Sequence, residues 1–214
     1  MTKVQDPGFP DFFAQAPVIT VRDPLAQFLG AVRQGLIQYG YADVVRLAGH
    51  SCPTVAGAYL MAVHGLRALY AGETPVRGDV EVFMRDARDS GVTGVISSVV
   101  QLVTGAAAET GFPGAGPSAL FARKNLLHFG ADVDGVLGMR RRDTGKAVSV
   151  HLDGALLPWP DEMRPLMAKA FSERADSAEL ERFAQLWQER VRLMLVDHAD
   201  DPAMVWVSDW HPAP

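Results

Sequence analysis

The sequence has little cysteine, no long uninterrupted apolar run and no excess of basic residues, and each shortage excludes a class of protein. A single cysteine among 214 residues rules out a disulfide within the chain and favours a reducing compartment. No apolar segment is long enough to span a bilayer without an interruption by Gly, Pro or His. The formal net charge of −5 gives no general attraction to nucleic acid. We therefore expect a cytoplasmic protein with neither a membrane nor a nucleic-acid partner.

Hydrophobic residues, by contrast, are plentiful. They make up 48% of the chain, which is enough for a sizeable core in one large domain or a domain with an added lobe. Segments with helical and with strand periodicity alternate without a regular βαβ order, so we predict an α+β fold with a mixed or antiparallel sheet. We expect an N-terminal arm over residues 1–22, an α+β core over 23–158, and an extension of two helices and a strand over 159–214.

Apolar spacing and turn residues predict the individual elements. Helices are expected over residues 24–38, 53–71, 91–108, 160–171 and 177–196. Strands are expected over residues 78–84, 120–129, 133–141, 147–152 and 204–209, the third and fourth of them joined as a hairpin. In the arm, Phe9, Phe12 and Phe13 are expected to pack on the body of the protein.

The residues best suited to chemistry lie in the run from Gly49 to Pro53, which reads Gly-His-Ser-Cys-Pro. Proline fits the first turn of a helix because its missing N–H would be unpaired there, so we predict that a helix begins at Pro53 with Cys52 at its cap. A sulfur at this position faces unpaired N–H groups and the positive end of the helix dipole, which favours the thiolate. A thiolate and the imidazole of His50 are good ligands for zinc, other late transition metals or haem iron.

Two ligands separated by one residue supply at most half of a tetrahedral zinc site, so other side chains must complete it. His128 is a candidate, and Asp79 and Glu81, at the start of one strand, could also reach. His151 is a weaker candidate. His64 is a poor one, because twelve further residues of the same helix carry it about 18 Å away. The predicted metal site consists of His50, Cys52, His128 and Asp79.

Other interpretations of these residues stay open. Cys52 could be the nucleophile of an enzyme with a histidine base, it could bind haem through its Cys-Pro dipeptide, or the segment could be a structural turn. His128 and His64 could be satisfied by ordinary hydrogen bonds. The arginines at 140–142 could form a solvated hairpin tip or an anion site. The chain could also be an interaction module whose Phe-rich arm faces another copy.

With these elements in order, the chain resembles the FmdE family, which takes its name from formylmethanofuran dehydrogenase. The resemblance rests on a Gly-His-x-Cys-Pro motif that opens a small-residue helix, on a Gln-Leu-Val-Thr-Gly string, and on an Asn-Leu pair followed by a Thr-Gly-Lys hairpin. In this sequence they are Gly49–Pro53, Gln101–Gly105, Asn125-Leu126 and Thr144–Lys146. Together they cover about residues 40–152, and His128 lies in the third feature, beside the Asn-Leu pair.

The resemblance implies an α+β domain that forms a homodimer and has a cleft around the His-x-Cys-Pro segment, where a metal ion or a small molecule binds. It does not imply formylmethanofuran oxidation, because that chemistry belongs to partner subunits with a molybdenum or tungsten pterin. The chain also departs from the family pattern. Val95 and Ala106 stand where members often have further cysteines, and the C-terminal part lacks the four-cysteine zinc ribbon that some members append.

Overall fold

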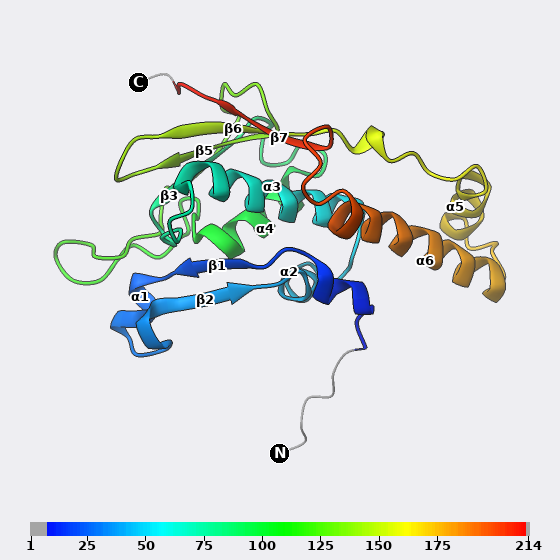
Figure 1. Ribbon diagram of the computed structural model, residues 1–214, viewed down its shortest axis with the longest axis horizontal. Coiled ribbons are helices and arrows are strands. Elements are labelled where there is room, and N and C mark those ends of the chain that lie inside the picture. Colours follow the sequence, from blue (N-terminus) through cyan, green and yellow to red (C-terminus); the bar gives the residue numbers. More distant parts are fainter. Residues whose placement is uncertain (1–7, 213–214) are drawn as a thin grey trace, which may run out of the picture.

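The computed structural model describes residues 8–212 and stacks a five-stranded sheet, two central helices and a two-stranded hairpin in layers (Figure 1). The sheet has the strand order β4-β3-β5-β6-β7, in which β3 and β4 are parallel and all other neighbours are antiparallel. Its strands are β3 (Val80–Met84), β4 (Leu127–Phe129), β5 (Leu137–Arg141), β6 (Ala147–Leu152) and β7 (Val205–Asp209). A mostly antiparallel sheet with helices on one face confirms the predicted α+β class.

The two central helices are α3 (Pro53–Tyr70) and α4 (Thr93–Thr104). Helix α3 packs against β6 and β7 of the sheet and against α4. Small residues allow the close approach, because a Cβ atom built on Gly65 would lie 2.3 Å from Sδ of Met139. Helix α3 runs antiparallel to β6: Gly57 lies against Leu152 near the start of the helix, while Nζ of Lys146 donates to the Ala68 carbonyl near its end (2.6 Å). Most of α3 is buried, so the small-residue helix is confirmed as a core helix.

The third layer lies on the other side of α3 and α4 from the sheet (Figure 1). It consists of β1 (Ile19–Arg22), α1 (Pro24–Phe28), β2 (Leu36–Tyr39) and α2 (Tyr41–Ala48), with a 3-10 helix over Asp11–Gln15 before it and another over Arg33–Gly35. Phe12 and Phe13 are buried, and Phe9 packs its ring on Phe13 at 5.3 Å. The prediction that the described part of the arm packs on the body is therefore confirmed, and residues 1–7 lie outside the described range.

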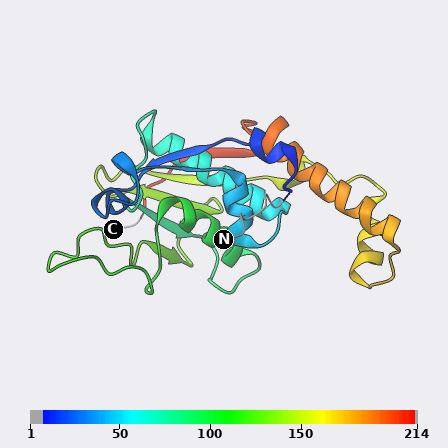
Figure 2. The same ribbon diagram turned by 90° about the horizontal axis from the view of Figure 1, so that it is seen from below.

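The C-terminal part forms a helical hairpin that extends away from the sheet (Figures 1 and 2). It consists of α5 (Met163–Phe171) and α6 (Ser177–Arg192), preceded by a 3-10 turn over Gly154–Leu156 and followed by a π-helical turn over Leu193–Asp197. Asp176 caps α6 where the helix over 177–196 was predicted to begin, since its carboxylate accepts from the backbone N–H of Glu179 at 2.9 Å. None of the helices over residues 8–212 is both long and apolar enough to cross a membrane.

The predicted helix over 24–38 is correct only at its start. Asp23 caps α1 by accepting from the N–H groups of Leu25 and Ala26, but the helix ends at Phe28. Gly30 and Gly35 then adopt positive φ angles of 71° and 72°, which turn the chain back on itself. The residues after this turn form β2 and pair with β1, so the apolar spacing over 24–38 was wrongly interpreted as one long helix.

The predicted strand over 120–129 is also wrong except for its last three residues. Ala119, Phe121 and Asn125 have positive φ angles of 50°, 61° and 58°, which extended backbone cannot contain. This part of the chain belongs instead to the long loop between α4 and β4, which lies at the opposite end of the molecule from α5 and α6 (Figures 1 and 2).

Candidate functional site

Cys52 caps helix α3 as predicted. Its Sγ accepts a hydrogen bond from the backbone N–H of Val55 at 3.4 Å, and Pro53 occupies the first helical position. The cysteine is only 9% exposed and belongs to the hydrophobic core. The sulfur therefore satisfies one of the free N–H groups of the helix and has little contact with solvent.

His50 lies just outside the helix and is exposed. Its Nδ1 is 3.0 Å from the carbonyl oxygen of Ala48. A proton on Nδ1 that donates to this carbonyl leaves the lone pair of Nε2 free for a ligand, and metal-binding histidines are commonly held in this way. The motif thus supplies one outward nitrogen and, two residues later, one mostly covered sulfur.

Helix α6 holds the residue between them. The carbonyl oxygen of Ser51 accepts from Nε1 of Trp187 (3.1 Å) and from Nε2 of Gln188 (3.2 Å). The Ser51 hydroxyl donates to Oε1 of Gln188 (3.0 Å) and lies 3.0 Å from the Tyr41 hydroxyl. These contacts fix the conformation of the His-Ser-Cys segment. No local pattern in the sequence indicated that α6 contacts a segment 136 residues earlier.

His128 lies on the opposite side of the sheet from Cys52. In β4 it pairs with Phe83 of β3, and its ring stacks on Phe83 with 4.7 Å between centroids. The neighbouring pair, Leu127 and Val82, is buried toward the central helices, so the alternation of a strand directs His128 to the outer face. Its Nε2 is buried and has no hydrogen-bond partner among residues 8–212.

The two acidic candidates are also separated from the motif. Glu81 lies on the outer face of the sheet and binds Nε of Arg140 at 2.8 Å. Asp79 lies just before β3, near the end of α3 remote from Cys52, and its carbonyl accepts from the backbone N–H of Arg142 (3.0 Å). Burial and, second, the nearby Asp143 raise the pKa of Asp79.

The two other histidines considered as ligands, His64 and His151, have ordinary partners. Nε2 of His64 lies 2.7 Å from the carbonyl oxygen of Ala199, and Nε2 of His151 lies 3.0 Å from the Ser208 hydroxyl. Over residues 8–212, no three His, Cys, Asp or Glu side chains are close enough to hold a metal ion together. Within the described part of the chain, the structure thus leaves His50 exposed and Cys52 buried two positions later, and it places the other predicted ligands elsewhere.

A charged cluster that the sequence did not reveal lies near the C-terminal end of α3. The carboxylate of Asp23, which is 4% exposed, accepts from Nη1 of Arg77 (2.9 Å) and from Nη2 of Arg123 (2.8 Å). Burial alone would raise the pKa of Asp23, but the N–H of Ala26 and the two guanidinium groups outweigh burial and lower it. Nothing in the sequence indicated this cluster, because the two arginines lie 54 and 100 residues from Asp23.

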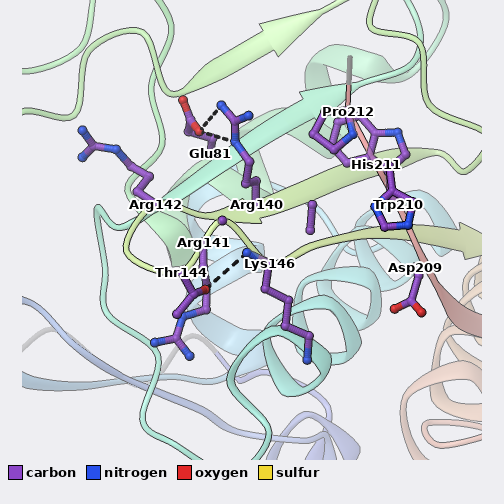
Figure 3. Close-up of a pocket in the computed structure, with 12 residues that line it drawn as sticks. Glu81, Arg140, Arg141, Arg142, Thr144, Lys146, Asp209, Trp210, His211 and Pro212 are labelled. Carbon is purple, nitrogen blue, oxygen red and sulfur yellow. Dashed lines mark hydrogen bonds and ion pairs between the residues drawn. The ribbon is translucent and has the colours of Figure 1, made fainter. Parts of the chain in front are cut away.

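The arginines at 140–142 do not form one basic tip. They line a cavity of about 820 Å³, where they point in different directions (Figure 3). Arg140 binds Glu81, while Arg141 binds Asp143 at 2.6 Å and is itself buried. Arg140 and Arg141 are thus paired with carboxylates, while Arg142 and the turn residues up to Lys146 are exposed and form the solvated hairpin end that the sequence allowed.

One family model matches the chain. It is described as "FmdE, Molybdenum formylmethanofuran dehydrogenase operon" and covers residues 47–201. This range begins three residues before His50, contains the two other features that carry the resemblance, and continues through α6, the helix that holds Ser51. It therefore includes part of the C-terminal segment that the sequence features alone did not reach. No curated protein matches the chain.

Proposed function

Because the chain belongs to the FmdE family, we propose that it is a metal-binding protein that holds a transition metal ion, preferably zinc, through His50 and Cys52. The observation that carries the proposal is the orientation of His50. Its Nδ1 is engaged by the Ala48 carbonyl, which leaves Nε2 outside the fold, two residues from the only sulfur of a cysteine in the chain. The family description names an operon, and we propose no formylmethanofuran oxidation for this chain.

The sulfur of Cys52 and the imidazole of His50 are the kinds of ligand that zinc prefers, but two ligands do not complete a zinc site. A sulfur and an imidazole nitrogen are typical zinc ligands, and zinc sites contain four ligands or three with an open position. The predicted partners His128 and Asp79 lie on the other face of the sheet and near the other end of α3. We therefore assign the missing ligands to a second copy of the chain or to a bound small molecule, and we expect a homodimer in which each chain supplies two donors.

The environment of Cys52 favours a small ion over the two other interpretations of the residue. Its side chain is largely covered, and α6 is hydrogen-bonded to the adjacent Ser51. A substrate attacked by a cysteine nucleophile, or the face of a haem, requires much more open space at the sulfur than a single ion does. A Soret absorption band in the purified protein would favour haem instead.

The test is the zinc content of the purified chain, measured together with its mass by light scattering. The wild type is expected to retain zinc after gel filtration, and His50→Ala and Cys52→Ser are each expected to lower zinc affinity at least about tenfold. His211→Ala, which removes an exposed histidine near the C-terminus, is the matched control. Zinc content that is unchanged in both motif variants would contradict the metal site, and a monomer that binds zinc would contradict the sharing of ligands between copies.

A further inference from the structure

Arg123 carries buried hydrogen-bonding capacity that the protein does not use. Its residue is only 7% exposed, and Nη2 binds Asp23. Nε and Nη1 are also buried, but neither has a hydrogen-bond partner among the described residues. Buried guanidinium groups are normally paired at all of their donors, because water no longer compensates for a missing acceptor. The Nε and Nη1 donors of the buried Arg123 therefore need an acceptor from outside the described residues.

Asp23 already accepts four hydrogen bonds, and none of them comes from Nε or Nη1 of Arg123. Its Oδ1 accepts from two backbone N–H groups as well as from Arg123, and its Oδ2 accepts from Arg77. The cavity beside the cluster is lined by the guanidinium-bearing residues Arg77, Arg123 and Arg142 and by Asp79. With Asp23 included, three positive charges face two carboxylates, so the region holds one positive charge in excess.

The cavity has a volume of about 400 Å³, which suits a small molecule rather than a single ion. Arg142 lines it with a side chain whose hydrogen bond, to the Gly78 carbonyl, is long at 3.4 Å. Leu120 and Phe121 supply an apolar wall, and the exposed ring of Phe28 packs on Phe121 at 5.3 Å. One side of the cavity is thus cationic and the other is apolar.

The local backbone is adapted to this arrangement. Gly78 has a φ of 90°, and a Cβ atom there would lie 1.9 Å from Nη1 of Arg123, so only glycine leaves room for the guanidinium. On the opposite wall, Ala119 and Phe121 adopt positive φ angles that are unfavourable for residues with a side chain. Strained backbone of this kind is concentrated at ligand-binding positions in proteins.

We propose that this cavity is a binding site for a small organic monoanion, a carboxylate attached to an aromatic or apolar body. The carboxylate binds the exposed side chain of Arg142, a small shift of the Arg123 side chain brings its unpaired donors to the same carboxylate, and the apolar body lies against Leu120 and Phe121. A monoanion matches the single excess positive charge. A phosphomonoester dianion would overcompensate it and would be repelled by Asp79, which lines the same cavity. The site is separate from the proposed metal site, because it lies near the other end of α3.

Isothermal titration with benzoate tests the proposal, with phenyl phosphate and the neutral benzyl alcohol as comparison ligands. Benzoate is expected to bind at one site per chain, more tightly than phenyl phosphate, and benzyl alcohol is expected not to saturate. Arg142→Ala should weaken benzoate at least about tenfold, as expected for loss of a charge-assisted hydrogen bond. Arg46→Ala, an exposed arginine near the other end of α3, is the control and should leave binding unchanged. Equal affinity in Arg142→Ala, or tighter binding of phenyl phosphate, would overturn the proposal.

Arg123 needs a second measurement, because a variant of a buried arginine can fail to fold. In Arg123→Met, Asp23 keeps Arg77 and its two backbone donors, so no carboxylate is left unpaired. A ligand-binding arginine predicts a melting temperature that is unchanged or raised and a loss of benzoate binding. A structural arginine predicts a lowered melting temperature, with benzoate binding retained by the folded fraction. Cys52→Ser should bind benzoate like the wild type, which separates this site from the metal site.

Discussion

At the N-terminal end of α3, the polar groups around Cys52 are neutral and almost all paired within the fold; near its C-terminal end, the groups around Arg123 are charged, buried and partly unpaired. The first region is one short stretch of sequence with a recognisable motif. The second is assembled from residues 23, 77 and 123, which no motif connects. In this molecule, a recognisable sequence motif and a cluster of buried, partly unpaired charged groups therefore lie at different places in the fold.

The two regions also differ in what holds them together. The Cys52 region depends on hydrogen bonds between neutral groups, each of which contributes about 1 kcal/mol. The Arg123 region depends on one buried carboxylate that serves two guanidinium groups and a helix cap. Removing the carboxylate from such a cluster is costly, because both guanidinium groups then lose their compensating charge.

The largest expected effect is therefore that of Asp23→Asn. The change removes the carboxylate that pairs with Arg77 and Arg123, and we expect a loss of about 3–5 kcal/mol in the free energy of unfolding, measured by urea denaturation. Asp200→Asn is the control, because Asp200 is a 72% exposed partner of Arg67 and should contribute at most about 1 kcal/mol. Similar losses of unfolding free energy in Asp23→Asn and Asp200→Asn would contradict the larger contribution expected of the buried ion pairs.

The stability of the wild type and of Asp23→Asn, measured at several pH values, tests whether the charge of Asp23 is responsible for the loss. The pKa of Asp23 is lowered by folding, so its contribution to stability is fully present above the unfolded pKa of about 3.9 and is lost as the pH falls through the lower folded value. We expect the stability difference between the wild type and Asp23→Asn to shrink from pH 6 to pH 2. A difference that stays constant over this range would show that folding does not lower the pKa of Asp23.

A change in the middle of α3 tests the helix that connects the two regions. Gly65→Ala places a Cβ against Met139 of the sheet, and we expect a loss of about 1–3 kcal/mol from overpacking. Gly94→Ala is the control, because nothing lies within 4 Å of the added Cβ and alanine favours the helix there by about 1 kcal/mol. Urea denaturation of both variants should thus show effects of opposite sign; two neutral changes would mean that α3 packs less closely on the sheet.

The smallest effects on stability are expected at Cys52. Serine is among the best residues at a helix N-cap, so Cys52→Ser should change stability by at most about 0.5 kcal/mol, whereas Cys52→Ala loses the acceptor for Val55 N–H and should cost about 1 kcal/mol. Both variants should lose the metal. Thermal unfolding in a chelating buffer checks the first statement, and a strongly destabilised serine variant would show that the sulfur has a packing role that a cap does not explain.

Local signals predicted much of the fold. The Cys-Pro pair located the start of α3, Asp176 located the start of α6, and the turn at 142–146 located the β5–β6 hairpin. The prediction was wrong where the apolar spacing competed with backbone conformation, as between Asp23 and β2, because the sequence does not state which glycines take positive φ. Helix and strand assignments at such places are decided by pairing partners elsewhere in the chain.

The candidate site was predictable only in its local part. The positions of His50 and Cys52 follow from one motif and one helix start. Whether His128 can join them depends on the face of β4 to which it points, and that face is set by the register with β3, a nonlocal property. The arginines that bind Asp23 lie 54 and 100 residues after it in the sequence. No short-range spacing pattern can therefore indicate them.

X-ray absorption at the zinc K-edge of the zinc-loaded chain tests the metal proposal most directly. The spectrum should contain one sulfur neighbour at about 2.3 Å together with nitrogen or oxygen neighbours at about 2.0–2.1 Å, and the sulfur signal should disappear in Cys52→Ser. A spectrum with only nitrogen and oxygen neighbours in the wild-type protein, or a sulfur signal that survives the substitution, would contradict it.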